Sequence, residues 1–291
     1  MTVKIVTDST ADLPSEMAKK LGITVVPIYV RFGEEVYRDG VDIGCDEFYQ
    51  KLAEGRTHPS TSQPTPTDFT DIYRQLSKEA DEIVSIHLSS KTSGTYSSAL
   101  QGRELAGAGC RIEVVDSFSI SMGLGLIVMA AARLAEAGES LQAVMEEIRQ
   151  AIPSIHLLGV FDTLKYLLLG GRIGKARALL GSVLNVKPLL TMRNGESLPA
   201  GLARTRSKGI ERLFNFVKDA LNIQEVAIVH STTPDEASSL KERIGSLFTK
   251  ERIHISRLGP GLGVHFGPST LAVALREKIS DIKQEPVKVS A

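Results

Sequence analysis

The sequence predicts an α/β protein built from two domains. In its first half, short β-branched runs alternate with helix-length amphipathic segments, which indicates right-handed crossovers and a mostly parallel sheet flanked by helices. In its second half, the Asn-Gly pair at residues 194–195 lies between two apolar runs and indicates a hairpin, so this sheet is mixed or antiparallel. The 291 residues, 42% of them apolar, are enough to bury a large core and to divide into two domains.

A change of composition near Pro153 marks the expected domain boundary. We therefore expect an N-terminal α/β domain over residues 1–152 and a C-terminal α/β domain over residues 153–281. Residues 282–291 are predicted to form a loosely held tail at the end of the chain.

The expected elements of the N-terminal domain follow from apolar periodicity and from helix boundary signals. Strands are expected at residues 3–9, 23–32, 82–88 and 111–117, and helices at residues 13–22, 45–55, 67–80, 94–107 and 121–138. Thr65, with Pro66 at the first helical position and Asp68 in the first turn, marks one helix start. Residues 34–43 resemble a hairpin, and the polar residues 56–69 are predicted to form a loop.

The C-terminal domain is expected to combine strands and helices in a similar number. Strands are expected at residues 155–162, 187–200, 225–231 and 252–258, and helices at residues 163–173, 206–221 and 235–248. Because the run at 187–200 contains the Asn-Gly turn, we expect it to fold back on itself.

Charge and aromatic content argue against a nucleic-acid partner. The chain has 34 basic and 34 acidic side chains without a long block of either sign, only 5% aromatic residues and no Trp. The N-terminus lacks the pattern of a signal peptide. The longest apolar stretch, residues 122–135, is shorter than the roughly 20 residues of a membrane-spanning helix. We expect a cytoplasmic protein without a transmembrane segment.

The common cofactor and metal motifs are missing from the sequence. Gly261 and Gly263 resemble the start of a dinucleotide-binding turn, but Phe266 stands where the third glycine is required. Cys45 and Cys110 each lie among residues that are not metal ligands, which argues against a disulfide framework and against a zinc site. The sequence therefore predicts neither a cofactor nor a metal.

Three polar loops are candidates for a binding site. Ser93 and Gly94 follow an expected strand where a helix begins, and free N–H groups at such a position favour an anion. Thr61 and Ser62 precede another helix start, and His265 lies among glycines and prolines. Hydroxyls at helix starts also act as caps and a histidine can be structural, so each loop alone has an ordinary explanation. Together the three loops make a site plausible.

Several stretches of the sequence together resemble the DegV family of bacterial fatty-acid-binding proteins, which are also called B-type subunits of fatty acid kinase. In chain order they are IVTDSTADLP, TSQPTPTDF, SSKTSGTYSSA, VVDSFSISMGLG, LKYLLLGGRIGKA, LNVKPLLTMRNG and GPGLGVHFGPST. They extend from the N-terminus to about residue 275 and cover nearly the whole chain. Ser269 departs from the family pattern, which usually has glycine at this position.

The resemblance implies that the protein encloses one long-chain, palmitate-like fatty acid in a buried tunnel. By position in the matching motifs, Thr61, Ser93 and His265 correspond to the residues that hold the carboxyl group. Ser62 and Gly94 are their neighbours.

The resemblance also implies a lipid carrier that is not itself an enzyme. Such a carrier presents the bound carboxylate to a partner, the fatty acid kinase, which forms an acyl phosphate for phospholipid synthesis. Arg172 falls on a family arginine associated with that partner, and Lys175 and Arg177 extend the basic surface. A transient contact with a membrane is compatible with this role.

Two expectations concern how the ligand is held. Apolar segments at residues 124–135 and 155–171 are expected to bind the acyl chain. Neutral hydroxyls, without an arginine fork, are expected around the carboxylate, since bidentate pairing with arginine would lower its nucleophilicity.

The alternative function is a lipid hydrolase or acyltransferase. In that hypothesis Ser93 is the nucleophile and His265 is the base. Asp8, near the end of the first strand, is the candidate third residue that would orient the base.

Overall fold

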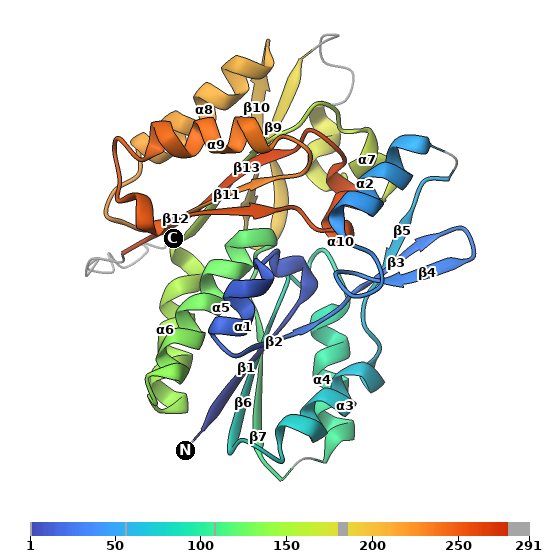
Figure 1. Cartoon of the computed structure of the whole chain (residues 1–291), viewed down its shortest axis with the longest axis vertical. Coiled ribbons are helices and arrows are strands. Elements are labelled where there is room, and N and C mark those ends of the chain that lie inside the picture. Colours follow the sequence, from blue (N-terminus) through green and yellow to red (C-terminus); the bar gives the residue numbers. More distant parts are fainter. Residues whose placement is uncertain (1, 56, 108, 180–185, 279–291) are drawn as a thin grey trace, which may run out of the picture.

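The computed structural model describes residues 2–55, 57–107, 109–179 and 186–278 (Figure 1). In this part of the chain, the first sheet is parallel and has the strand order β2–β1–β6–β7. Its strands are β1 (Val3–Asp8), β2 (Ile23–Val26), β6 (Glu82–His87) and β7 (Arg111–Asp116). The helices on its two faces are α3 (Pro66–Leu76) and α4 (Thr95–Ala106) on one, and α1 (Ser15–Lys20), α5 (Ser121–Glu136) and α6 (Leu141–Ser154) on the other (Figure 1).

The second sheet is mixed, and its order among the described residues is β10–β9–β8–β13–β11–β12. Its strands are β8 (Ile155–Val160), β9 (Lys187–Arg193), β10 (Glu196–Ala203), β11 (Ile223–His230), β12 (Ile253–Arg257) and β13 (Leu271–Glu277). Strands β11 and β12 are parallel, and the other described pairs are antiparallel. The helices α8 (Arg206–Lys218) and α9 (Pro234–Ile244) pack on one face.

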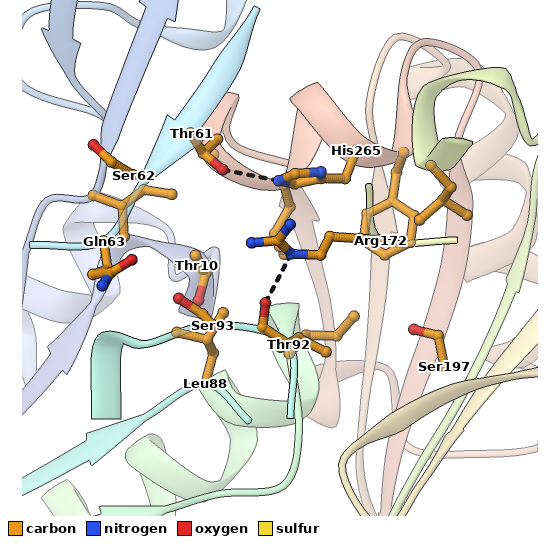
Figure 2. A pocket seen from close by; sticks show the side chains of 16 residues that line it. Thr10, Thr61, Ser62, Gln63, Leu88, Thr92, Ser93, Arg172, Ser197 and His265 are labelled. Carbon is orange, nitrogen blue, oxygen red and sulfur yellow. Dashed lines mark hydrogen bonds between the residues drawn. The ribbon is translucent and has the colours of Figure 1, made fainter. Parts of the chain in front are cut away.

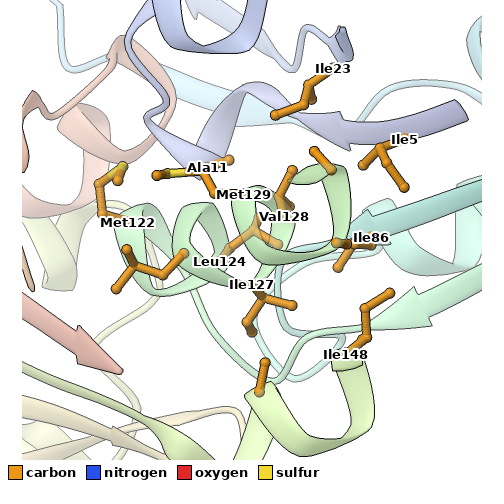
Figure 3. Close-up of a cluster of buried hydrophobic side chains, with 14 of the residues drawn as sticks. Ile5, Ala11, Ile23, Ile86, Met122, Leu124, Ile127, Val128, Met129 and Ile148 are labelled. Carbon is orange, nitrogen blue, oxygen red and sulfur yellow. The ribbon is translucent and has the colours of Figure 1, made fainter. Parts of the chain in front are cut away.

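Helix α5 lies between the two sheets and joins their cores (Figures 1 and 3). Its residues 121–132 are all buried, which is expected of a helix that is apolar on every side. Leu124 and Met129 belong to a cluster that includes Ile5 of the first sheet and Val229 of the second. One apolar cluster therefore contains residues from both halves of the chain.

A small antiparallel sheet and several short helices lie beside this core. Within the described residues its order is β4–β3–β5, with β3 (Tyr29–Phe32), β4 (Glu35–Arg38) and β5 (Ser60–Ser62). The neighbouring helices are α2 (Cys45–Glu54), α7 (Lys165–Leu169) and α10 (Pro260–Phe266), and the 3₁₀ helices are η1 (Ser9–Ala11), η2 (Gly174–Leu179) and η3 (Lys250–Arg252). Val264 of α10 packs against Val30 of β3 and Phe48 of α2, which ties this sheet to the C-terminal half.

The predicted fold class is confirmed, as are two local signals. Asn194 and Gly195 have positive φ angles of 49° and 80°, as the predicted hairpin turn between β9 and β10 requires. Thr65 caps α3, where its hydroxyl accepts from the Asp68 N–H and the Asp68 carboxylate accepts from the Thr65 N–H.

The structure corrects several predicted elements. The run 23–32 is divided at Pro27 into β2 and β3, which belong to different sheets. The segment 56–69, predicted to be a loop, contains β5. Helices α6 and α10 and the central strand β13 were not predicted.

The predicted domain boundary stays a prediction. Pro153, where the boundary is expected, lies inside α6, one residue before that helix ends. The expected tail at 282–291 lies outside the described residues. None of the helices in the described part of the chain combines the length and the apolar character that a membrane span requires.

Candidate functional site

A cavity with polar walls opens at the carboxyl edge of the parallel sheet. Thr10 follows β1 and Leu88 follows β6, and these two strands are neighbours in the middle of the sheet. The chain runs from β1 outward to β2 on one side, and from β6 outward to β7 on the other side. Such a reversal of strand order is where open α/β sheets bind ligands. The cavity, called the polar cavity below, has a volume of about 640 Å³ including space open to solvent. Its walls are Thr10, Ile28, Thr61, Ser62, Gln63, Leu88, Thr92, Ser93, Ile120, Leu167, Arg172, Ser197, Gly261, Leu262, His265 and Phe266.

Four of the five predicted ligand-binding residues line the polar cavity. Thr61, Ser62, Ser93 and His265 reach it from β5, from the start of α4 and from α10 (Figure 2). Gly94 is not among the lining residues, but a side chain there would place Cβ 2.7 Å from the Gln63 amide nitrogen. Gly94 therefore allows Gln63 to approach the start of α4 closely.

Thr61 and His265 are joined across the cavity. Thr61 Oγ1 lies 2.9 Å from His265 Nε2, although the two residues are 204 positions apart in the chain (Figure 2). His265 Nδ1 is buried and has no hydrogen-bond partner among the described residues. If Nε2–H donates to Thr61 Oγ1, the threonine hydroxyl keeps its own hydrogen for a ligand.

The imidazole of His265 is held neutral at physiological pH. Burial is the main cause that lowers its pKa from 6.5 to about 4, and the positive charge of Arg172 acts in the same direction. Histidine in this environment is a neutral hydrogen-bonding group in the unliganded protein.

Ser93 lies just before α4, whose N-cap residue is Gly94. Ser93 Oγ accepts from the Thr95 N–H at 3.2 Å and lies 2.9 Å from Thr95 Oγ1. The hydroxyl therefore binds the first N–H group of α4 and also lines the polar cavity.

Arg172 also lines the polar cavity, so a guanidinium lies near the predicted hydroxyls. The expectation that the carboxylate is held without an arginine fork stays a prediction. Its Nε donates to the Thr92 carbonyl oxygen at 3.0 Å, and its Nη1 donates to the Gly170 carbonyl oxygen at 3.4 Å. Figure 2 shows the guanidinium between His265 and Thr92, directed toward the middle of the cavity. An anion in the cavity would therefore meet a fixed positive charge.

An apolar cavity continues from the polar one. It measures about 430 Å³ including open space, and both cavities have Ile120, Ser197 and Phe266 in their walls. Phe266 is stacked on Phe161, with 5.3 Å between the ring centroids. The remaining walls are Ser121, Leu157, Leu158, Gly159, Phe161, Leu190, Thr191, Met192, Leu258, Thr270 and Ala272.

One of the two segments that are predicted to bind the acyl chain lines these cavities, and the other does not. Residues from the segment 155–171 line the cavities, as expected. Residues 124–135 line neither cavity, because α5 is enclosed between the sheets. Walls from β9 and β13 were missed, because the hairpin partner and the central strand contribute them only once the second sheet has formed.

Sequence reasoning also missed four polar residues of the cavity. These are Thr10, Gln63, Thr92 and Ser197. Gln63 and Thr92 lie in loops that had already been singled out, and Thr10 follows a predicted strand at the same sheet edge. The sequence carries no comparable signal for Ser197.

The third residue of the hydrolase alternative is contradicted by the structure. Asp8 Oδ2 lies 2.9 Å from His87 Nδ1, and His87 Nε2 lies 2.7 Å from Ser85 Oγ. These three side chains are fully buried, and none of them lines the polar cavity. Asp8 therefore orients His87 and not His265.

Among the hydrogen bonds of the described residues, none joins Ser93 to His265. Ser93 Oγ contacts Thr95, His265 Nε2 contacts Thr61, and His265 Nδ1 has no partner there. The covered residues also include no group of three or more His, Cys, Asp or Glu side chains that could hold a metal ion. The arrangement is suited to binding an anionic group beside an apolar channel.

Comparison with known proteins gives one consistent family. The model of the DegV family, a family described as uncharacterised, matches residues 2–278. A DegV domain-containing protein of Caldanaerobacter subterraneus subsp. tengcongensis is 36% identical over 279 residues, which cover 95% of this chain and 99% of the relative.

Solved structures of similar fold are described as fatty acid binding. A DegV family protein from Thermus thermophilus, described by its fatty acid binding, has a TM-score of 0.88 and 36% identity, and the match covers 96% of this chain and 100% of that one. DegV from Bacillus subtilis, described as a fatty acid binding protein, has a TM-score of 0.87 and 30% identity with the same coverage.

Proposed function

The chain belongs to the DegV family, and we propose that it binds one long-chain fatty acid. The carboxyl group occupies the polar cavity and the acyl chain occupies the apolar cavity. The observation that carries this proposal is the continuity of the two cavities through Ile120, Ser197 and Phe266. A ligand with one anionic end and a long apolar body matches both parts.

The acyl chain supplies most of the binding free energy. Palmitate has about 14 methylene groups, and burying each contributes about 0.8 kcal/mol, so the chain contributes about 11 kcal/mol before costs. Lost translational freedom and ordering of the chain oppose this by roughly 4 to 15 kcal/mol. The head group is then needed mainly to fix the orientation of the ligand.

The head group is held by hydroxyls and by one guanidinium. We assign Thr61, Ser93 and His265 to the carboxylate, with Ser62 beside them and Gly94 making room for Gln63. In this assignment His265 Nε2–H donates to Thr61 Oγ1, and the Thr61 hydroxyl donates to the carboxylate. Arg172 adds a positive charge at the same end of the cavity.

A non-enzymatic carrier fits this geometry better than the hydrolase alternative. Ser93 Oγ is engaged by Thr95 and His265 Nε2 by Thr61, so neither is arranged as a nucleophile and its base. The carrier would present the carboxylate to a partner, the fatty acid kinase. There a carboxylate oxygen attacks the γ-phosphorus of ATP, the bond to the bridging oxygen breaks, and acyl phosphate and ADP result.

Arg172 is the residue that we assign to engagement of the kinase. It is exposed, lies at the carboxylate end of the cavity and is followed by Lys175 and Arg177. A positive surface at this place attracts the acidic or nucleotide-bearing face of a kinase. The cytoplasmic location and a transient membrane contact stay predictions.

Extraction of the freshly purified protein tests the carrier proposal. We expect organic solvent to release about one intact long-chain fatty acid per chain, detected by mass spectrometry. The denatured protein should keep its unmodified mass, because no acyl-enzyme forms. A mass increase that survives denaturation and maps to Ser93 would instead support the hydrolase or acyltransferase.

Thr61→Val tests the head-group assignment. The variant keeps the size of the side chain but loses the hydroxyl, so palmitate should bind about tenfold more weakly, in line with about 1.5 kcal/mol for a hydrogen bond to a charged group. The alcohol 1-hexadecanol should change by less than twofold, since it lacks the carboxylate. Displacement of a fluorescent fatty acid measures both affinities.

The exposed Thr67→Val is the matched control for that experiment and should leave both affinities unchanged. Equal losses for the acid and the alcohol, or no loss for either, would contradict the placement of the carboxylate beside Thr61.

A further inference from the structure

Two buried carboxyl side chains outside the polar cavity contact the start of α10. Asp12 follows η1, and Asp39 follows β4. The Gly259 N–H donates to Asp12 Oδ1 at 2.8 Å, and the Gly261 N–H donates to Asp39 Oδ2 at 3.2 Å. Both side chains belong to residues that are about 95% buried, with exposed fractions of 6% and 5%. They line a separate cavity.

These carboxyl groups replace the cap that α10 lacks. Its N-cap residue, Gly259, has no side chain to accept from the free N–H groups of the first turn. Acceptors are instead supplied by segments more than 200 residues earlier in the chain.

Each carboxyl group is itself held by a segment that forms another wall of the polar cavity. Ser121 Oγ lies 2.5 Å from Asp12 Oδ2, and the preceding Ile120 lines both cavities. Ser9 Oγ lies 2.8 Å from Asp39 Oδ2 and accepts from the Ile28 N–H at 3.1 Å. The carboxyl groups therefore connect α10 to segments that carry other wall residues of the polar cavity, Ile120 and Ile28.

The glycines of α10 permit this close approach. A Cβ at Gly261 would lie 2.8 Å from Asp39 Oδ2, and a Cβ at Gly263 would lie 2.5 Å from Phe48 Cε1. The glycine spacing that resembles a nucleotide motif thus serves the packing of α10 against the N-terminal half. Because the helix rises about 1.5 Å per residue, His265 lies within about 10 Å of these contacts on one rigid element.

We infer that Asp12 and Asp39 are positioning residues of the lipid site: they fix α10 so that His265 Nε2 meets Thr61 Oγ1 in the polar cavity. The inference rests on the proposed function for its ligand, and it concerns residues that touch neither the cavity nor the fatty acid. The pair Asp12 and Asp39 is called the carboxyl clamp below.

Asp39→Ala tests the clamp through head-group discrimination. The variant should lower the ratio of palmitate to 1-hexadecanol affinity about tenfold, with the alcohol changed by less than twofold. Asp39→Asn, which retains an acceptor, should restore the ratio to within threefold of the wild type. Added to Thr61→Val, Asp39→Ala should cause no further loss, because both changes remove the same contact. The exposed Asp71→Ala is the matched control.

If Asp39→Ala does not fold, Gly263→Ala provides a second test of the carboxyl clamp. This variant keeps both carboxyl groups and adds no atom to the polar cavity, yet its Cβ displaces α10 from Phe48. The same loss of discrimination is expected. Gly109→Ala is its control, because a Cβ there has no neighbour within 4 Å.

The imidazole nitrogen chemical shifts of His265 in lipid-free protein provide a readout that requires no ligand. These chemical shifts should change in Asp39→Ala and Gly263→Ala. They should stay at their wild-type values in the controls Asp71→Ala and Gly109→Ala. Wild-type shifts together with a wild-type affinity ratio in the folded variants would overturn the inference. Failure of the wild type to bind palmitate would instead overturn the proposed function, and the shifts would still test the clamp.

Discussion

Ala272→Phe is expected to weaken palmitate binding by more than a hundredfold. Ala272 lies on β13 and lines the apolar cavity, so a phenyl ring there occupies space that the acyl chain needs. Displacing about four methylene groups removes about 3 kcal/mol of binding free energy, which corresponds to more than two powers of ten in affinity. Titration with palmitate and with laurate, which is four methylene groups shorter, measures the effect.

Laurate should lose much less affinity than palmitate, because its chain reaches less far into the apolar cavity. Ala200→Phe, on the exposed surface of β10, is the matched control and should bind both acids as the wild type does. If folded Ala272→Phe keeps its affinity for palmitate, the acyl chain does not occupy this cavity.

The stability of the wild type relative to Asp12→Asn is expected to fall as the pH rises. Burial is the main cause that raises the pKa of Asp12 from 3.8 to about 8; hydrogen bonds from Ser121 and Gly259 oppose this, and the charges of Asp39 and Asp8 add to it. Between about pH 4 and pH 8 the folded protein keeps the proton on Asp12, whereas the unfolded chain releases it above about pH 4.

The sign of the effect follows from this difference in bound protons. Because the folded state binds more protons than the unfolded state between pH 4 and 8, the contribution of Asp12 to stability decreases with rising pH. The slope is at most about 1.4 kcal/mol per pH unit for one group. Asparagine does not titrate, so Asp12→Asn should gain stability relative to the wild type from pH 5 to pH 8.

Urea unfolding of both proteins at pH 5, 6, 7 and 8 measures the difference in the free energy of unfolding. Comparing the pair is necessary because other groups titrate in this range: burial raises the pKa of Asp39 to about 6, and the lowered pKa of His265 contributes with the opposite sign. The control is the exposed Asp71→Asn, whose free energy of unfolding should differ from that of the wild type by the same amount at every pH. The same pH-independent difference for Asp12→Asn would contradict a protonated Asp12.

Elements with a local cause could be predicted, and elements stabilised from elsewhere could not. The capping box of Thr65 and Asp68 and the Asn-Gly turn at Asn194 are formed by neighbouring residues. Helix α10 is rich in glycine and proline, which by local preference indicates a loop. It is a helix in the structure, with its first N–H groups bound by Asp12 and Asp39 from the other half of the chain.

The missed helix α6 has a different explanation, because its signal was present. Ser140 caps it, and Leu141, Val144 and Ile148 recur at helical spacing and are buried. The change of composition at Pro153 was instead interpreted as a domain boundary. In the structure, Pro153 lies in the last turn of this helix, where proline is tolerated.

By itself, the sequence determined that three separate segments carry the polar groups Thr61, Ser93 and His265. It did not show that Thr61 lies in β5 or His265 in α10. Only the tertiary structure decided that Thr61 meets His265 across 204 residues, that Arg172 enters the same cavity, and that β13 rather than α5 lines the apolar cavity. The physical reason is that periodicity specifies which face of an element is apolar, whereas the partner of that face is chosen by the packing of the whole core.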